Sequence, residues 1–179
     1  PKKIAFTGHR PEALPFGENE AVATCVQLKA MLHMEILENV KQGYCIYLCG
    51  AARGADIMFA EQVLLIRAAY HPQIQLICVV PHEEQAKSWS EAWRNRYFAM
   101  LEQADDMILI SQHNVHGCYH RRNRYMVDHA DALLAIYNGS ANDGTAYTLD
   151  YAKHQSKRIV QIDPKTLIRT VISARSTRL

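Results

Sequence analysis

Short apolar runs alternate with helical patterns along almost the whole chain, and this alternation limits the folds available to it more than any other feature. Each run has the length of a strand, and most are followed by a stretch in which apolar residues recur at helical spacing. Strands and helices that alternate in this way build a mostly parallel sheet with helices on both faces. The sequence therefore predicts a doubly wound, Rossmann-like α/β fold of about six strands, at residues 3–7, 44–48, 74–80, 106–110, 132–137 and 158–162.

Five helices are expected between these strands, and a short additional helix followed by frayed residues is expected in the tail from Lys165. No linker, repeat or low-complexity stretch divides the chain, and 179 residues is the size of one domain. Residues 1–179 are therefore predicted to form a single Rossmann-like domain. Its main helices are predicted at residues 19–42, 57–70, 83–103, 119–129 and 144–155.

The composition gives little indication of a charged or membrane partner. Twenty basic residues face 18 acidic ones, for a net charge of +2, which disfavours nucleic acid or an anionic membrane as a partner. No apolar run approaches the roughly 18–20 residues of a membrane span, and the N-terminal residues do not resemble a signal peptide. The five cysteines lack C-x-x-C spacing, which is typical of reduced thiols and predicts a cytoplasmic protein.

The turn after the second strand carries the first functional signal. Gly50 and Gly54 allow the backbone to approach a ligand closely, and Arg53 adds a forked cationic donor suited to phosphate. Asp56 follows at the start of a helix, where it can cap the helix or accept a hydrogen bond from a ribose hydroxyl. A strand, a glycine-bearing turn and a helix form a common anion site, whereas the alternative is a tight turn with a surface arginine.

Other turns that follow strands carry residues of the same kind. Because ligands of doubly wound sheets bind beyond the carboxyl ends of the strands, these turns are expected to converge on one site. The alternative is that such loops are rich in Gly and Asn for conformational reasons alone. The residues expected to bind the ligand are Thr7, Gly8, His9, Arg10, Gly50, Arg53, Gly54, Asp56, Pro81, Arg122, Asn123, Asn138, Gly139, Gly144 and Thr145.

Three other patterns in the sequence bear on cofactor, metal and base binding. Neither G-x-G-x-x-G after the first strand nor G-x-x-x-x-G-K-[ST] occurs, which disfavours ordinary dehydrogenase and P-loop chemistry and predicts no required cofactor. The spacing of His113, His116, Cys118 and His120 is compatible with zinc, but no second pair of ligands is evident, and a histidine-rich loop without metal is preferred. The series Trp89, Trp93 and Tyr97 forms one helical face, which favours core packing or a subunit contact, and thus leaves a homo-oligomer open, over a base-stacking platform.

A resemblance adds to this interpretation. The segments 7–11, 50–56 and 117–128, together with Glu61, Pro81, Gln85, Trp89, the run 143–145 and the pair 151–152, resemble the YpsA-like family of the SLOG superfamily. The resemblance covers nearly the whole chain, and relatives of that family include the DNA-processing protein DprA and the LOG phosphoribohydrolases. It implies a Rossmann-like sheet with a pocket for a nucleotide or a nucleotide-derived ligand such as ADP-ribose or NAD.

The chain departs from that pattern in three places. Ala51 and Asp143 stand where the family commonly has glycine, and a carboxylate at Asp143 is expected either to repel a phosphate or to turn toward solvent. The phosphoribohydrolase motif lacks its glutamate here, because Thr145 is followed by Ala146, Tyr147 and Thr148.

Three functions follow from these patterns. The preferred one is a cytosolic protein that binds a small nucleotide-derived ligand. The alternative is a hydrolase of an N-glycosidic or phosphate bond, for which Asp56, Glu61 and His9 are the catalytic candidates. The third is DprA-like binding of single-stranded DNA, which only the arginines at 121, 122 and 124 favour.

Overall fold

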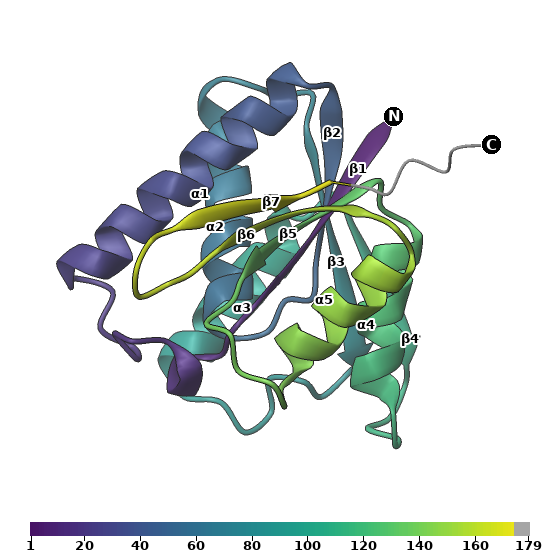
Figure 1. Cartoon of the computed structure of the whole chain (residues 1–179). Coiled ribbons are helices and arrows are strands. Elements are labelled where there is room, and N and C mark those ends of the chain that lie inside the picture. Colours follow the sequence, from purple (N-terminus) through teal and green to yellow (C-terminus); the bar gives the residue numbers. More distant parts are fainter. Residues whose placement is uncertain (174–179) are drawn as a thin grey trace.

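The computed structural model describes residues 1–173 and contains one seven-stranded sheet with helices on both faces (Figure 1). The strands lie in the order β4-β3-β2-β1-β5-β6-β7, and all neighbours pair in parallel except β6 and β7. The predicted doubly wound α/β fold is therefore confirmed, with one strand more than expected. The elements are β1 (Lys2–Gly8), the 3-10 helix η1 (Pro11–Ala13), α1 (Ala23–Lys41), β2 (Tyr44–Cys49), α2 (Ala55–Ala69), β3 (Gln75–His82), α3 (Glu91–Gln103), β4 (Asp106–Ser111), α4 (Cys118–Asp128), β5 (Ala132–Ile136), α5 (Gly144–His154), β6 (Arg158–Ile162) and β7 (Arg169–Ile172).

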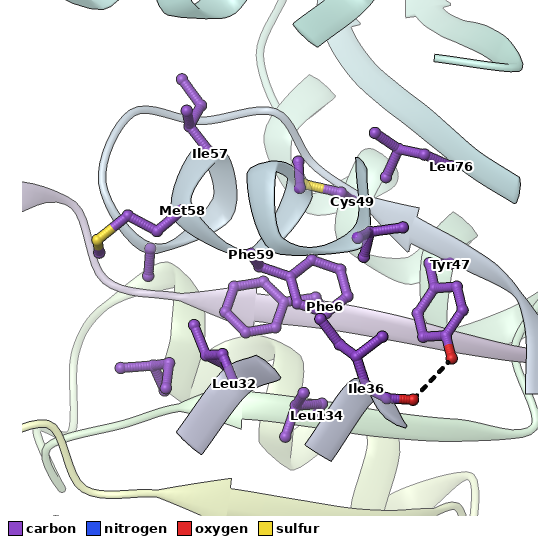
Figure 2. Packing of buried hydrophobic residues seen from close by; sticks show 14 of the residues in the cluster. Phe6, Leu32, Ile36, Tyr47, Cys49, Ile57, Met58, Phe59, Leu76 and Leu134 are labelled. Atoms are coloured by element: carbon purple, nitrogen blue, oxygen red, sulfur yellow. Dashed lines mark hydrogen bonds between the residues drawn. The ribbon is translucent and has the colours of Figure 1, made fainter. Parts of the chain in front are cut away.

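Two apolar layers hold the sheet between its helices. The larger layer packs α1, α2 and α3 on one face, where Phe6 of β1 stacks on Phe59 of α2 with ring centroids 4.3 Å apart. Figure 2 shows this cluster, including the hydrogen bond of 3.3 Å that the Tyr47 hydroxyl donates to the carbonyl of Ile36. The smaller layer packs α4 and α5 on the other face, around Leu133 and neighbouring residues. Each central strand is covered on both sides, which explains why its residues read as continuous apolar runs.

Two predicted helices are shorter than expected at their N-terminal ends. Residue 19 does not begin α1: residues 11–13 form η1, turns follow, and the helix starts at Ala23. The helix expected at 83–103 exists only as α3, because Ser90 caps it by accepting a hydrogen bond from Trp93 N–H (3.4 Å). The residues before Ser90 form turns that bury Gln85, so helical spacing alone placed the boundary wrongly. Trp93 and Tyr97 are buried in the larger layer, which confirms core packing for them.

The tail folds differently from the prediction of a short helix. Asp163 accepts hydrogen bonds from the backbone of Lys165 and Thr166, and Leu167 adopts a positive φ of 59°. This turn reverses the chain, so that β7 pairs antiparallel with β6. The β-branched residues of β7 favour a strand over a helix there. The predicted fraying of the last residues falls outside the described part of the chain.

No helix within residues 1–173 has the combination of length and apolar character that crossing a membrane requires. In the same range, no three His, Cys, Asp or Glu side chains gather as ligands for a metal ion. Cys118 instead donates to Asn114 Oδ1 at 3.7 Å, and the His120 ring stacks on Tyr147 with centroids 3.9 Å apart.

Candidate functional site

A cavity of about 440 Å³ lies at the carboxyl edge of the sheet. It opens where β1 and β5 lie side by side, which is the point at which successive connections leave toward opposite faces of the sheet. Doubly wound sheets bind their ligands at this switch point. The cavity is within the size range of small-molecule sites. Its walls are formed by Thr7, Gly8, His9, Arg10, Glu12, Ala13, Ala52, Asp56, Tyr119, His120, Arg122, Asn123, Met126, Asp143, Gly144 and Thr145.

The end of β1 and the start of α2 approach each other closely beside this cavity. A Cβ at Gly8 would lie 2.5 Å from the Cβ of Ala55, so only glycine fits there. Gly54 has a φ of 94°, a conformation that glycine adopts readily, and this allows Ala55 N–H to donate to the His9 carbonyl at 3.0 Å. The two glycine-bearing turns that the sequence singled out are therefore joined by a backbone hydrogen bond.

Two buried charges of opposite sign form the floor. Arg122 donates from Nε to Asn123 Oδ1 at 2.7 Å and from Nη1 to the Gly50 carbonyl, and the side chain is 5% exposed. Asp56 is equally buried, and its Oδ2 accepts a hydrogen bond of 3.1 Å from Ala52 N–H. The absent side chain of Gly50 makes room for this pair, because a Cβ there would lie 2.6 Å from Arg122 Nη1 and 2.9 Å from Asp56 Oδ2.

Burial shifts the proton affinity of both members of this pair. Removal from water disfavours the carboxylate and raises the pKa of Asp56 to about 6, although the positive charge of Arg122 opposes the shift. Burial likewise lowers the pKa of Arg122, and the charge of Asp56 opposes that shift. Arg122 Nη2 and Asp56 Oδ1 make no side-chain hydrogen bond within residues 1–173. The floor thus presents a guanidinium and a carboxyl group whose bonding capacity is not used up by the fold.

His9 is also buried, but its ring is fully occupied. Its Nδ1 donates to Asp143 Oδ2 at 2.9 Å, and its Nε2 accepts from Asn138 N–H at 2.9 Å. An imidazole nitrogen that accepts a backbone N–H carries no proton, so the ring is neutral. Burial lowers the pKa of His9 in agreement with this, against the opposing charge of Asp143. His9 therefore joins the β1 end to the loop after β5, and its nitrogens are not available as an acid or base.

The N-terminus of α5 closes another wall. Asp143 caps this helix, because its Oδ1 accepts from Ala146 N–H at 2.8 Å, while its Oδ2 accepts from the Ser140 hydroxyl and from His9. Asp143 thus faces protein donors and lines the cavity, and the expectation that its carboxylate repels a phosphate stays a prediction. Gly144 and Thr145 begin the helix and line the cavity, where helix N-termini favour anions.

The structure brings together nine of the fifteen predicted ligand-binding residues. Thr7, Gly8, His9, Arg10, Asp56, Arg122, Asn123, Gly144 and Thr145 line the cavity. The other six lie outside its walls, and they are Gly50, Arg53, Gly54, Pro81, Asn138 and Gly139.

Two charged residues proposed from the sequence point elsewhere. Arg53 forms an ion pair with Glu12 of η1 and lies 3.9 Å from Glu18, so its charge is partly neutralised beside the cavity. Glu61 pairs with Arg96 of α3 and takes no part in the cavity wall. Asp56, Glu61 and His9 were the three candidates for hydrolysis. Only Asp56 both lines the cavity and has an atom, Oδ1, that bonds to no other side chain or backbone group of the described residues.

Tyr119 and Met126 complete the α4 wall but were not selected from the sequence. Two guanidiniums lie near the Tyr119 ring, with Arg10 Cζ 5.5 Å and Arg122 Cζ 5.6 Å from its centroid, and the Tyr119 hydroxyl is 3.1 Å from His82 Nε2. Helical spacing could have identified both residues, because Tyr119 and Met126 share a face with Arg122 three and four positions away. The remaining unselected wall residues are Glu12, Ala13, Ala52, His120 and Asp143.

Comparison with known proteins places the chain. The model of the YpsA family, described as the YspA SLOG family, matches residues 4–167. The chain belongs to this family. It is 30% identical to the UPF0398 protein BH1768 of Halalkalibacterium halodurans over 160 residues, which are 88% of this chain and 83% of that protein. It is 33% identical over 143 residues to an uncharacterised SPbeta prophage-derived protein, YoqJ, of Bacillus subtilis, covering 73% of this chain and 82% of the relative.

A solved structure supports the same fold assignment. DNA processing protein A from Helicobacter pylori superposes with a TM-score of 0.60, covering 93% of this chain and 70% of that protein. The sequence identity is 17%, so this likeness bears on the fold. The Rossmann-like SLOG architecture expected from the sequence is thus confirmed.

Proposed function

We propose that this YpsA-family chain binds a nucleotide-derived small molecule in the cavity at the β1–β5 switch point. The observation that carries the proposal is the buried guanidinium of Arg122 at the floor, whose Nη2 donates to no side chain or carbonyl of the described residues. A guanidinium N–H that lines a cavity and has no protein acceptor is free to donate a charge-assisted hydrogen bond to an anionic ligand.

The surrounding groups suit a phosphate followed by a sugar. Arg10 is exposed at the rim and forms no ion pair with a described residue, so its charge is available. The N-terminus of α5 at Gly144 and Thr145 offers backbone N–H groups and a hydroxyl to phosphate oxygens. Asp56 Oδ1 is placed to accept from a ribose hydroxyl, which requires the ionised carboxylate that prevails above a pKa of about 6.

Calorimetric titration of the chain with ADP-ribose, NAD and AMP tests this proposal. Binding is expected with at least one of them, and Arg10→Gln is expected to weaken it by about tenfold, the value of one lost charge-assisted hydrogen bond. Arg121→Gln is the matched control, because Arg121 is an exposed arginine that lines none of the cavity. The absence of heat with all three ligands at millimolar concentration, or equal losses in the two variants, contradicts the proposal.

Single-stranded DNA is a second candidate ligand. The structural neighbour from Helicobacter pylori is described for its single-stranded DNA binding mode, and His120 stacks on Tyr147 at the mouth of the cavity with a ring face that can receive a base. DNA binding would weaken steeply with salt because it displaces counterions from the strand. A gel shift with oligonucleotide at 50 mM salt that is lost at 200 mM, together with no calorimetric signal for the three small ligands, would favour this candidate.

A further inference from the structure

The strand β4 forms one edge of the sheet, and no other strand within residues 1–173 pairs with its outer side. Val80 of β3 pairs with Leu109, but the next residue of β3 is Pro81, which has no N–H to donate to the Leu109 carbonyl. The backbone groups of Leu109 therefore point away from β3. Because backbone direction alternates along a strand, those of Met107 and Ser111 also point outward. The outer side of β4 thus offers peptide groups that another strand can bind.

The same strand is apolar on a face that the helices leave uncovered. Ile108 and Ile110 pack against the smaller apolar layer. Side chains alternate between the faces of a sheet, so Met107 and Leu109 lie on the opposite face, which carries α3. They are 48% and 37% exposed, and Phe98 of α3 is 59% exposed. An edge strand that carries exposed apolar side chains is a template for association.

The other edge of the sheet is protected. The strand β7 has only four residues, and its Arg169 forms an ion pair with Glu35 of α1. Short edge strands and charged side chains are devices that prevent edge-to-edge pairing. The strand β4 has six residues, and its single charged residue is Asp106 at the first position, where Oδ1 accepts from Met107 N–H at 2.8 Å. The open edge is therefore β4.

An identical strand complements this edge. Two β4 strands related by a twofold axis at Leu109 would pair antiparallel, with Leu109 opposite its own equivalent. Ile108 would then lie opposite Ile110 of the second copy, which joins apolar side chains on the α4 face. This register uses the outward peptide groups of Met107, Leu109 and Ser111. An axis shifted to Ile108 would leave those of Ser111 unpaired.

The polar ends of the strand complement each other in the same register. Asp106 of one copy would lie opposite Gln112 of the other, so the amide can donate to the carboxylate once Met107 N–H pairs with the second strand. An axis at Ile108 would instead set the Asp106 carboxylate opposite the apolar Ile110. The charge and the hydrogen-bonding groups of β4 therefore favour the axis at Leu109.

We infer that the chain forms a twofold-symmetric dimer in which β4 pairs antiparallel with β4 of a second copy, so that one sheet runs through both copies. This inference does not rest on the proposed function, because β4 contributes no residue to the cavity wall. A contact between two edge strands is small among protein interfaces. The dimer is therefore expected to dissociate at chain concentrations between about 1 and 100 µM.

Sedimentation velocity over this concentration range tests the dimer. Leu109→Lys brings two like charges together at the twofold axis and is expected to weaken the dimer by at least about tenfold. Val171→Lys is the matched control, because Val171 is 40% exposed in the other edge strand, and it is expected to leave dimerisation within about twofold of the wild type. Urea denaturation of both variants verifies that each one folds.

Disulfide cross-linking tests the register. Directly opposed residues of this pair would have Cα atoms about 5.5 Å apart, which a disulfide can bridge. Leu109→Cys is therefore expected to form a covalent dimer in oxidised glutathione on a non-reducing gel. Met107 would lie roughly 14 Å from its equivalent, so Met107→Cys is expected to give no more covalent dimer than the wild type with its own cysteines.

Each contrary result identifies what is wrong. A wild type that sediments as a monomer throughout the range overturns the inference and would leave β4 as an edge for an extended segment of another protein. A dimer that Leu109→Lys does not weaken, or that Val171→Lys weakens equally, uses another surface and also overturns it. Stronger cross-linking of Met107→Cys than of Leu109→Cys contradicts the antiparallel register at Leu109 and overturns the inference as well. Ligand binding is unaffected by any of these outcomes.

Discussion

His9 and Arg122 both contribute buried nitrogen-bearing side chains to the cavity, yet the fold treats them differently. The two ring nitrogens of His9 are bonded to Asp143 and to the backbone of Asn138, which leaves the imidazole neutral and fully satisfied. Arg122 keeps its charge beside Asp56, and part of its guanidinium has no protein acceptor among residues 1–173. The comparison teaches that His9 serves to join β1 to the loop after β5. Arg122, at the floor of the cavity, keeps hydrogen-bonding capacity that the fold does not use. Substitutions at His9's partners and at Arg122 are therefore expected to change the free energy of unfolding by different amounts and with a different dependence on pH.

Removal of the Arg122 side chain is expected to lower the stability of the protein more than any other substitution considered at this site. Arg122→Met removes the hydrogen bonds to Asn123 and to the Gly50 carbonyl together with the positive charge that opposes the burial of Asp56, and is expected to lower the free energy of unfolding by about 3–5 kcal/mol. Urea denaturation measures this change. Arg121→Met is the matched control and is expected to stay within about 0.5 kcal/mol of the wild type, because Arg121 is exposed.

The double variant Asp56→Asn with Arg122→Met tests the cause of that loss. If an uncompensated charge is responsible, removing it as well recovers part of the lost stability. A double variant that is as unstable as the sum of its single variants would mean that shape, and not charge, explains the loss at Arg122.

The pH dependence of stability sharpens the comparison, because burial raises the pKa of Asp56, beside Arg122, to about 6, whereas burial lowers the pKa of His9. Between about pH 4 and 6 the folded protein still holds a proton on Asp56 that the unfolded chain has released, so raising the pH through this interval destabilises the wild type. Asp56→Asn has no titrating carboxyl group at this position and therefore lacks this pH-dependent loss of stability. The free energy of unfolding of the wild type relative to Asp56→Asn is therefore expected to fall by about 2–3 kcal/mol from pH 4 to pH 7.

Urea titrations of both proteins at several pH values measure this difference. Taking the difference between them cancels carboxylates such as Glu20, whose pKa is lowered by its hydrogen bond to Arg96 against the opposing effect of burial, and which stabilise the fold in the opposite sense. Parallel curves for the two proteins would show that Asp56 is already ionised throughout this pH range. His9 contributes in the opposite sense to Asp56, because burial lowers its pKa and the unfolded chain therefore binds a proton that folded His9 does not, and this contribution also cancels in the difference.

The edge of the sheet at which the cavity lies could be predicted from the sequence, and the reason is topological. The carboxyl ends of parallel strands meet at one edge, so Gly8 after β1 and Thr145 after β5 had to lie near each other once the alternation of elements was recognised. The neutral state of His9 could not be predicted. It depends on hydrogen bonds to Asn138 and Asp143, which are distant in sequence and are placed by the pairing of β1 with β5.

The direction in which long side chains point could not be predicted from the sequence either. Arg53 follows the predicted glycine turn, but its guanidinium pairs with Glu12 in a short 3-10 helix that carries no periodic signal. The boundaries of α3 and the strand β7 were missed for a similar reason. Residues before Ser90 have helical spacing but bury Gln85 in turns, and β7 forms only because the turn at Asp163 returns the chain to β6.

The smallest expected effect concerns Asp143, which both caps α5 and bonds to His9. Asp143→Ala removes both interactions and the hydrogen bond from the Ser140 hydroxyl, and is expected to cost about 1–2 kcal/mol of unfolding free energy. Asp143→Ser retains a hydroxyl that can cap the helix but is too short to reach His9, and is expected to cost about 1 kcal/mol less than the alanine variant. Because His9 is neutral, its contact with the Asp143 carboxylate is one hydrogen bond and not an ion pair. The loss of stability from the wild type to Asp143→Ala should therefore be the same at pH 6 and pH 8 in urea denaturation, whereas a loss that is larger at pH 6 would mean that His9 carries a charge beside Asp143 and that His9 and Arg122 are more alike than their bonding implies.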